Sequence, residues 1–562
     1  MAEVDRRLTA PGATFEMDEV VIRGIPTRVW KNAPSSLRWL AEASRGHGER
    51  LAIIHEDERV SYAAQFRAIA ALAHTIVAMG VGKGDRVAIA MRNLPEWPVA
   101  FFATTAIGAV AVPLNAWWTG AELDYGLRDS GARVLIVDGE RHERLVQHYP
   151  GLPALERVLV SRAEAPSTGV AERLEAVIGT PHDWAALPEV DLPPAMIDTD
   201  DPATIFYTSG TTGAPKGALG THRNLVTNIL STACNGARPY LRRGEAPPEP
   251  TPRIGLLVIP LFHVTACSAT LMGVVASGGT LVLMRRWETV KAMEIIERER
   301  VNATGGVPTI AWQLLEHPKR SRFDLSSLET ITYGGAPAAP DLAPRLRAEF
   351  GVQPGNGWGM TETMATVTGL LAEDYLHRPA SCGAPVPVAD LKIMDVDASH
   401  VLPTGEIGEL WARGPMVVAG YWNKPEATAA TFVDGWVRTG DLARLDDEGF
   451  CYIVDRAKDM VIRGGENIYS IEVENALFSH PAVMDAAVIG LPHRVLGEEP
   501  AAVVHLAPGE AVTEAGLQAW VRTQLAGFKV PVAIRFVPGM LPRNANGKIL
   551  KRELAVLFDD RV

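Results

Sequence analysis

The sequence predicts an α/β protein in which a large N-terminal domain is followed by a smaller α+β domain, and three observations support this prediction. Over the first two hundred residues, helical and strand-like patterns alternate, which is typical of parallel sheet with crossover helices. In residues 385–455 helical patterns become rare and glycines separate short strands. Residues 458–562 again mix helices and strands.

Chain length supports the same division. One hydrophobic core rarely serves more than about 250–300 residues, and this chain has 562. We therefore expect an N-terminal domain of residues 1–457, in which two α/β subdomains with parallel-rich sheets precede a β-rich subdomain at about 385–455. Residues 458–562 are expected to form a C-terminal lid domain.

Hydrophobic periodicity places the individual elements. Apolar residues at helical spacing predict helices, and short apolar runs between turn residues predict strands. In the first domain we expect helices at 63–79 and 97–107 and strands at 86–90, 109–113, 133–137, 254–259, 328–333, 390–393 and 408–412. In the lid we expect helices at 470–479 and 513–524, strands at 485–489 and 501–506, and a helix after Gly547.

Two segments need separate interpretation. Residues 264–284 approach the ~20 apolar residues that a membrane span needs, but Gly278 and Gly279 divide them, so we expect a buried helix, a glycine turn and a strand. Residues 236–253 are rich in Pro, Arg and Glu and are expected to form a surface loop.

Composition excludes several classes of function. The net charge of −12 and the pI of about 5.7 argue against generic binding of nucleic acid or anionic membranes. The four cysteines are scattered without a Cys-x-x-Cys pair, which argues against a zinc ribbon or a redox motif. The N-terminus lacks an apolar signal-peptide core. We expect a cytoplasmic protein without a transmembrane segment, and a homodimer is a reasonable expectation.

The segment YTSGTTGAPKG, residues 207–217, is the most informative part of the chain. Its glycines let backbone N–H groups approach an anion, its hydroxyls add donors, and Lys216 adds a positive charge. It is not a Walker A loop, because Lys216 is followed by Gly217 rather than by Ser or Thr. An apolar run at 203–206 indicates a strand that leads into this loop. We expect the loop to bind a polyphosphate.

This loop resembles the signature of the adenylate-forming enzymes, which include acyl-CoA synthetases, aryl-CoA ligases, nonribosomal adenylation domains and firefly luciferase. Other motifs follow in the family's order across roughly residues 30–555. The resemblance implies an AMP-forming acyl-CoA synthetase of the fatty-acid–CoA ligase branch. Such an enzyme joins AMP to a carboxylic acid and then passes the acyl group to CoA, using ATP and Mg²⁺.

The resemblance also implies site residues. Lys548, Thr208, Glu362 and His263 would take part in catalysis, with Glu362 holding Mg²⁺ and Lys548 bridging the acid and the α-phosphate during adenylation only. The ATP and AMP contacts would come from Thr208, Ser209, Gly210, Thr211, Thr212, Gly213, Lys216, Gly335, Ala336, Pro337, Asn356, Gly357, Trp358, Thr361, Glu362, Asp441, Arg456 and Lys548.

The family's lid rotates between its two reactions. The resemblance implies a hinge at Lys458 and a path for CoA along Gly464, Gly465, Glu466 and Asn467. The acyl pocket would be formed by His263, Val264, Cys267, Ala269, Trp312, Gly334, Gly359, Met360 and Thr366, with Trp312 limiting its depth.

The nature of the acid stays open at this point. A medium-to-long fatty acid is favoured, and an aryl or alicyclic acid is the second possibility. Cys267 stands where some long-chain synthetases carry a gating tryptophan, so that type of gated tunnel is not expected. Three different functions also stay open: a stand-alone enzyme that loads a carrier protein, a luciferase-type oxidase, and a non-catalytic nucleotide-binding protein.

Overall fold

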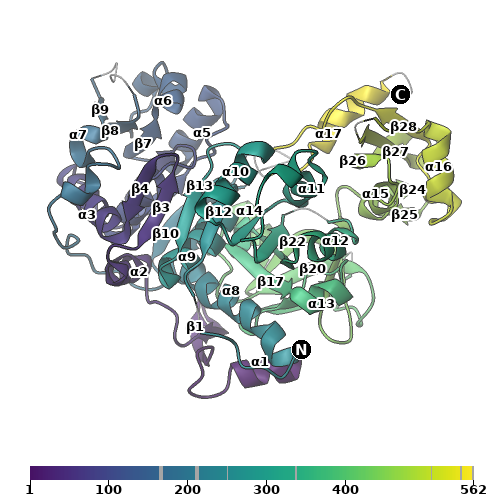
Figure 1. Ribbon diagram of the computed structural model, residues 1–562, viewed down its shortest axis with the longest axis horizontal. Coiled ribbons are helices and arrows are strands. Elements are labelled where there is room, and N and C mark those ends of the chain that lie inside the picture. The colour runs from purple at the N-terminus through teal and green to yellow at the C-terminus, as the bar shows by residue number, and fades with distance from the viewer. Residues whose placement is uncertain are drawn as a thin grey trace.

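The computed structural model describes residues 1–163, 169–208, 214–249, 251–335, 338–395, 397–507, 509–544 and 547–559. Figure 1 shows a broad body formed by the N-terminal residues, and a smaller lobe in yellow that is set to one side of it. The N-terminus lies at the edge of the body, and the C-terminus lies in the small lobe. The expected α/β class, with a large N-terminal domain and a small C-terminal domain, is confirmed.

The first sheet has seven strands in the order β11-β10-β6-β5-β7-β8-β9. Its central strands are parallel and buried along almost their whole length, as expected of a sheet covered on both faces. The predicted strands at 86–90, 109–113 and 133–137 are confirmed. The bounds are β5 Arg86–Ala90, β6 Val110–Pro113, β7 Val134–Asp138, β8 Arg157–Ser161, β9 Ala171–Arg173, β10 Pro202–Tyr207 and β11 Gly217–Thr221.

The second sheet has nine strands in the order β18-β17-β16-β15-β14-β12-β13-β3-β4. Strands β16 and β15 are parallel neighbours, and β17 pairs with β16 in the antiparallel sense. The bounds are β3 Leu51–His55, β4 Glu58–Ser61, β12 Ile254–Leu257, β13 Thr280–Leu283, β14 Ala303–Gly306, β15 Thr330–Gly334, β16 Gln353–Met360, β17 Ala365–Leu371 and β18 Ala384–Pro385.

The largest core cluster joins the two sheets through helices. It contains Ile89 of β5, Leu281 of β13 and Phe101 of α4, all with 1% exposure or less. Helices α3 and α4, predicted at 63–79 and 97–107, supply most of its aromatic side chains. The helices named below are α2 Leu37–Ser44, α3 Tyr62–Ala78, α4 Glu96–Ala106, α5 Gly120–Ser130, α6 Gly139–Leu145, α8 His222–Arg242, α9 Met272–Ser277, α10 Thr289–Glu299, α11 Pro308–Glu316, α12 Leu342–Phe350 and α13 Ala372–His377.

A buried ion network also ties the sheets together. Arg162, after β8, pairs with Glu96 at the start of α4 and with Glu58 of β4, each at 2.9 Å. Glu96 and Glu58 are almost fully buried, and Glu58 also contacts His55 at 2.9 Å. Removing one partner from such a pair leaves an uncompensated buried charge, which costs several kcal/mol. The network therefore makes the relative position of the two sheets specific.

The prediction for residues 236–253 was partly wrong, because α8 continues through Arg242. Pro239 lies inside the helix, and Arg238 is 2% exposed. Arg238 pairs with Asp5 at 2.9 Å and donates to the carbonyl of Pro385 at 2.6 Å. These tertiary contacts outweigh the local preference of proline to end a helix.

The prediction for residues 264–284 is confirmed. A π-helical turn at Thr265–Leu271 leads into α9, Gly278 adopts a φ of +68° that favours glycine, and β13 follows. Among the described residues, no helix is both long and apolar enough to cross a membrane.

The remaining chain forms the small β subdomain and the lid. The β subdomain contains β19 Asp390–Met394, β20 Gly408–Arg413, β21 Phe432–Val433, β22 Trp436–Leu445 and β23 Cys451–Arg456. The lid contains β24 Val461–Arg463, β25 Glu466–Ile468, α15 Ser470–Phe478, β26 Val483–His493, β27 Gly497–Leu506, α16 Glu514–Arg522, β28 Ala533–Phe536 and α17 Lys551–Leu554. Strands β24, β25 and β28 were not predicted, because each is short and gains its stability by pairing with its neighbours.

Candidate functional site

The ends of the predicted phosphate loop are joined at the top of the first sheet. Strands β10 and β11 pair in the antiparallel sense, with Tyr207 opposite Gly217. Beyond them, the Thr208 N–H donates to the Lys216 carbonyl at 2.9 Å, and the Lys216 N–H donates to the Thr208 hydroxyl at 3.3 Å. Residues Ser209, Gly210, Thr211, Thr212 and Gly213 lie outside the described residues. The described ends of the loop are therefore joined between two antiparallel strands, unlike a Walker A loop, which leads into a helix.

Tyr421 links this loop to Glu362, and the sequence analysis did not identify it. Its ring lies 4.5 Å from the Lys216 ammonium, and its hydroxyl donates to Glu362 Oε1 at 2.6 Å. The backbone beside it is fixed to β11, since Leu219 donates to Gly420 and Trp422 donates to Gly217. The aromatic pair Tyr421–Trp422, directly after Gly420, could have indicated a functional position from the sequence.

Glu362 fits the expected ligand for Mg²⁺. Its side chain is buried, and the described residues place no cationic side chain within ion-pair distance of it. The described residues also contain no group of three His, Cys, Asp or Glu side chains arranged to hold a metal. Mg²⁺ commonly uses one or two protein carboxylates together with phosphate oxygens and water. A single carboxylate beside a phosphate loop suits that mode of binding.

The predicted adenine-binding segments lie on adjacent strands. Gly334 of β15 is opposite Gly357 of β16, and a Cβ at Gly334 would lie 2.9 Å from the Gly357 carbonyl. Gly335 has a φ of +75° and open space around it, while Ala336 and Pro337 lie outside the described residues. Asn356 donates to the Ser381 carbonyl at 3.2 Å, and Thr361 begins the short turn that carries Glu362.

Asp441 is held by two of the other predicted site residues. The Trp358 indole donates to Asp441 Oδ2 at 2.8 Å, and Arg456 lies 3.2 Å from Asp441 Oδ1. Asp441 and Arg456 are opposite each other on β22 and β23. The structure thus brings Trp358, Asp441 and Arg456 together.

His263 begins the segment that carries most of the predicted acyl pocket. Burial lowers the pKa of its imidazole to about 3, with a further contribution from Lys548, so the ring is neutral. Val264 and Cys267 are buried in the large core cluster, and Ala269 packs against it. On β17, the Thr366 N–H donates to Asn228, whose amide donates in turn to Ser268 at 2.8 Å. The β16–β17 turn is closed at Gly359, where a Cβ would meet the Ala365 carbonyl, and Met360 follows.

Trp312 is not placed with these residues. Its ring lies under the guanidinium of Arg345 on α12, 5.2 Å away, and it packs in the separate cluster formed by α10–α12. Trp312 therefore packs in a different core cluster from Val264 and Cys267.

Lys548 extends from the lid into this group of residues. Burial and the charge of Arg456 lower the pKa of its ammonium, Asp441 and Glu362 act in the opposite direction, and the resulting pKa is about 8. The preceding Gly547 packs against the large domain, where a Cβ would lie 2.7 Å from a Val307 methyl carbon. The lid thus places one ammonium near Glu362, in the turn after β16, and near Asp441 and Arg456 on β22 and β23.

The Lys548 loop has its own support within the lid. Asp485 of β26, which is 1% exposed, pairs with Arg543 at 2.7 Å and accepts from the Leu541 N–H at 3.1 Å. Arg543 donates to the Gly547 carbonyl at 2.7 Å. Neither Asp485 nor Arg543 was identified from the sequence, because nothing near them in the chain indicates the pairing.

The predicted hinge and CoA segment lie next to each other. Lys458 is in the turn between β23 and β24, and burial lowers its pKa. Gly464 and Gly465 both have positive φ and form the exposed two-residue turn between β24 and β25. Glu466 and Asn467 are exposed on β25. In this structure the glycine turn is open to solvent while Lys548 occupies the site.

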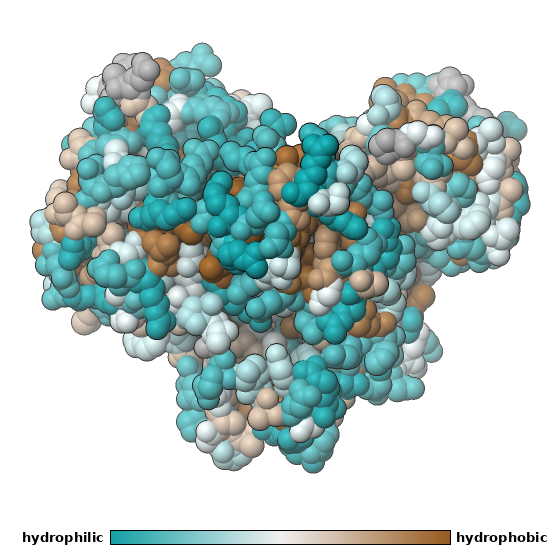
Figure 2. All heavy atoms as spheres, viewed as in Figure 1, coloured by the Kyte–Doolittle hydropathy of each residue, from teal (hydrophilic) through white to brown (hydrophobic). Residues whose placement is uncertain are grey.

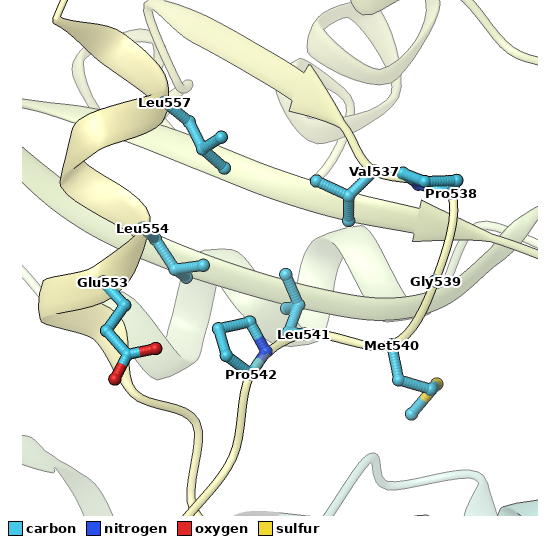
Figure 3. Close-up of a pocket in the computed structure, with 9 residues that line it drawn as sticks. All are labelled: Val537, Pro538, Gly539, Met540, Leu541, Pro542, Glu553, Leu554 and Leu557. Carbon is cyan, nitrogen blue, oxygen red and sulfur yellow. The ribbon is translucent and has the colours of Figure 1, made fainter.

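A separate apolar pocket lies wholly within the lid (Figure 3). It encloses about 370 Å³ between residues 537–542 and the side chains of Glu553, Leu554 and Leu557. The labelled side chains come from the segment after β28 and from the C-terminal helix, and none is a predicted site residue. The pocket is therefore distinct from the Lys548 site. Figure 2 shows a mainly hydrophilic face on the body, with hydrophobic residues concentrated in its recesses.

Comparison with known families gives two matches that together span most of the chain. Residues 40–422 match the AMP-binding enzyme family, and residues 472–548 match the C-terminal domain of AMP-binding enzymes. Three relatives illustrate the range of known activities. A feruloyl-CoA synthase of Amycolatopsis is 38% identical over 92% of this chain and 98% of its own length. A 4-coumarate–CoA ligase of rice is 34% identical over 85% and 84%. A long-chain-fatty-acid–CoA ligase of Mycobacterium tuberculosis is 34% identical over 89% and 93%.

Solved structures agree with this assignment. An anthranilate CoA ligase in complex with anthranoyl-AMP has a TM-score of 0.82 and 27% identity, covering 93% of this chain and 97% of its own. An o-succinylbenzoate CoA synthetase of Bacillus subtilis in complex with its acyl-adenylate intermediate has a TM-score of 0.75 and 32% identity, covering 92% and 97%.

Proposed function

The chain belongs to the AMP-binding enzyme family as an acid–thiol ligase of the acyl-CoA synthetase type, and we propose that it adenylates a carboxylic acid with ATP and then transfers the acyl group to CoA. In the first step a carboxylate oxygen bonds to the α-phosphorus of ATP, and pyrophosphate leaves. In the second step the CoA thiol bonds to the acyl carbon, and AMP leaves with the electron pair of the broken C–O bond.

The position of Lys548 is the observation that carries this proposal. The carboxylate and the α-phosphate are both anionic, so their approach is opposed by repulsion that a nearby ammonium offsets. Lys548 lies close enough to Glu362, Asp441 and Arg456 for their charges to act on its pKa. The loop that ends at Lys216 is expected to stabilise the departing pyrophosphate.

Glu362 would hold Mg²⁺ beside the phosphates, where the ion supplies charge neutralisation. Tyr421 orients Glu362 through their 2.6 Å hydrogen bond. Asp441 and Arg456 would bind the ribose, and the segments at Gly335 and Asn356 would border the adenine. His263, as a neutral ring, would shape the acyl pocket without adding charge.

The second step requires the lid to move. The Lys458 turn supplies the hinge, and a rotation that withdraws Lys548 would bring the exposed Gly464–Gly465 turn to the site. Two glycines without side chains suit a narrow path for a thiol. Hinge motion of this kind lets one site perform two reactions in sequence.

We propose an aryl acid of the ferulate or coumarate type as the first candidate substrate. Support comes from the feruloyl-CoA synthase and the 4-coumarate–CoA ligase among the relatives, which are 38% and 34% identical to this chain. A medium-to-long fatty acid, favoured by the sequence alone, is the second candidate, because a long-chain ligase is 34% identical.

Three measurements test the proposal. A screen of CoA-dependent AMP release over aryl, alicyclic and fatty acids identifies the acid, and a parallel assay with a carrier protein tests the acceptor. The Lys548→Ala variant is expected to lose ATP–pyrophosphate exchange and to retain thioester formation from supplied acyl-AMP. Equal loss of both half-reactions would contradict the role assigned to Lys548, and the absence of exchange with every acid would contradict the proposed function.

A further inference from the structure

The turn that carries Glu362 has a strained backbone. Residues Thr361–Thr363 form one short turn between β16 and β17, and the next two residues, Met364 and Ala365, have φ values of +44° and +95°. Residues with a Cβ rarely adopt this left-handed region, so both conformations cost free energy. Strain of this kind persists only where surrounding contacts hold it in place. The contacts that hold Met364 therefore also fix Glu362, two residues earlier.

Asn228 on α8 supplies those contacts. Its side-chain amide donates to the Met364 carbonyl at 2.6 Å, and its side-chain oxygen accepts from the Thr366 N–H at 3.0 Å. The two bonds flank Ala365, and the Asn228 side chain is fully buried. A buried polar side chain whose hydrogen bonds are all formed specifies a single local geometry. Asn228 thus clamps the strained residues from both sides.

The same amide also reaches the segment of the predicted acyl pocket. Asn228 donates to the Ser268 hydroxyl at 2.8 Å, and Ser268 is fully buried as well. Ser268 lies in the π-helical turn Thr265–Leu271, between Cys267 and Ala269, two of the predicted pocket residues. Single π-helical turns are rare and are frequent at functional sites. One side chain therefore joins the Glu362 turn to the predicted wall of the acyl pocket.

A second asparagine, Asn224, holds the other side of the Glu362 turn. Its amide donates to the Val417 carbonyl at 3.1 Å, and the next residue, Val418, donates its N–H to the Glu362 carbonyl at 3.0 Å. Residues four apart lie on the same face of a helix, so α8 presents both asparagines to one side. Helix α8 directly follows β11, the strand that leaves the phosphate loop. One helix face therefore supports three parts of the site.

We propose that Asn228 is a positioning residue that holds the Glu362 turn and the wall of the acyl pocket in fixed register for adenylation. This inference rests on the proposed function, because it deepens the roles of Glu362 and of the acyl pocket. A carboxylate binds a metal well only when supporting hydrogen bonds orient it. The acid must also be placed accurately against the α-phosphate, since a small misplacement slows the reaction strongly. Asn228 fixes both positions with one side chain.

The first test removes all three of these bonds with Asn228→Ala. Mn²⁺, which also takes carboxylate and water ligands, serves as the probe for the metal. With a non-hydrolysable ATP analogue bound, its Kd, measured by electron paramagnetic resonance, is expected to rise about 10-fold. The KM for the acid in pyrophosphate exchange is expected to rise about 5-fold, because the pocket wall loses a hydrogen bond. Thioester formation at saturating acyl-AMP should stay within about two-fold of the wild type.

Ser268→Ala separates the two roles. It removes only the bond between Asn228 and the acyl segment, and the freed amide hydrogen still has the Asn224 carbonyl at 3.3 Å. The KM for the acid is expected to rise about 5-fold, while the Kd for Mn²⁺ stays at the wild-type value. A residue that only stabilised the fold would lower the melting temperature without producing this split.

Asn302→Ala is the matched control. Asn302 directly precedes β14, and its side chain accepts from the N–H of Ile254, the first residue of β12, at 3.0 Å. This is the amino end of the parallel strands, whereas Gly334 and Gly335 lie at the carboxyl end of β15. Asn302→Ala should therefore leave the Kd for Mn²⁺ and the KM for the acid unchanged.

Three results decide the inference. It is overturned if folded Asn228→Ala keeps the wild-type Kd for Mn²⁺, or if Ser268→Ala keeps the wild-type KM for the acid. If Asn228→Ala does not fold, Asn228→Asp carries the same expectation for Mn²⁺, because it has the same size and keeps the bond from Thr366. Absence of exchange in the wild-type enzyme with every acid would instead refute the proposed function.

Discussion

Lys548 is the residue at which pH dependence should be visible. Its ammonium must be charged to offset repulsion between the acid and the phosphate, and burial lowers its pKa to about 8. Well below pH 8 the ammonium is fully protonated, and the protonated fraction falls as the pH rises through about 8. We predict that kcat/KM for ATP in pyrophosphate exchange falls above about pH 8, since this quantity reports the free enzyme.

Lys548→Arg is the matched variant, because guanidinium keeps its charge throughout this range. Its exchange rate is expected to be lower than that of the wild type, since the geometry differs, but its profile should stay flat above pH 8. The same alkaline decrease in both proteins would assign the titration to another group.

Tyr421 should affect the reaction through Glu362. Burial and the nearby carboxylate raise the pKa of Tyr421, so its hydroxyl keeps the proton that it donates to Glu362. Tyr421→Phe removes that bond, and loss of such a supporting bond costs about 10- to 100-fold in metal affinity or activity. We predict a higher Mg²⁺ requirement for pyrophosphate exchange, measured by Mg²⁺ titration at fixed ATP.

Tyr452 offers the control for this change. Its hydroxyl donates to Asp446 at 3.0 Å in the β subdomain, outside the site. Tyr452→Phe should leave the Mg²⁺ titration unchanged. An unaltered titration in Tyr421→Phe would show that Glu362 needs no support from Tyr421.

At the scale of elements, β26 positions the loop that carries Lys548. Asp485 pairs with Arg543 and accepts from Leu541, so Asp485→Asn leaves the Arg543 charge without its buried partner, a cost of about 3–5 kcal/mol. We predict at least a 10-fold loss of pyrophosphate exchange, while thioester formation from supplied acyl-AMP stays within about two-fold of the wild type. The second half-reaction does not use Lys548. If the variant keeps thioester formation, its loss of exchange comes from disorder of the Lys548 loop and not from unfolding of the lid.

Glu472→Gln provides the comparison within the lid. Glu472 pairs with Lys529 at 2.6 Å, but the pair is more exposed and lies apart from the Lys548 loop. Both half-reactions should survive this change. A parallel loss of both in Asp485→Asn would mean that Asp485 holds the lid itself together.

At the scale of the whole molecule, Asp455 joins the large domain to the lid. It lies on β23, before the Lys458 turn, and accepts from the Ser470 N–H and from the Ser470 hydroxyl at 2.9 Å. Lys551 of the lid donates to the same hydroxyl at 2.7 Å. Burial raises the pKa of the Asp455 carboxyl, and Lys551 opposes that shift. These contacts hold the lid where Lys548 reaches the site.

We predict that Asp455→Asn shifts the lid away from this position. Hydrogen bonds to charged groups contribute about 1.5–3 kcal/mol, which corresponds to at least a 10-fold shift between lid positions.

Because all four cysteines are buried, fluorescent labels at Val495→Cys and Met196→Cys can report the distance between the lid and the large domain by energy transfer. With ATP bound, Asp455→Asn should populate a second distance, whereas Asp324→Asn, in an exposed pair, should not. A single distance in both proteins would show that Asp455 does not hold the lid.

Several features of the site were predictable because their chemistry lies in adjacent residues. The strand that leads into the Thr208–Lys216 loop depends on local backbone preferences, and so does the glycine turn after α9. The central strands of the first sheet were predicted for the same reason, since parallel strands covered on both faces are short, continuous apolar runs.

By itself, the sequence determined the α/β class, the family and the order of the motifs, because each is encoded in contiguous segments. Tertiary structure alone decided the rest. It extended α8 through Pro239, placed Trp312 under Arg345, paired Tyr421 with Glu362, and brought Lys548 near Glu362, Asp441 and Arg456. These contacts join positions far apart in the chain, and their free energies depend on burial and on neighbouring charges that no local pattern specifies.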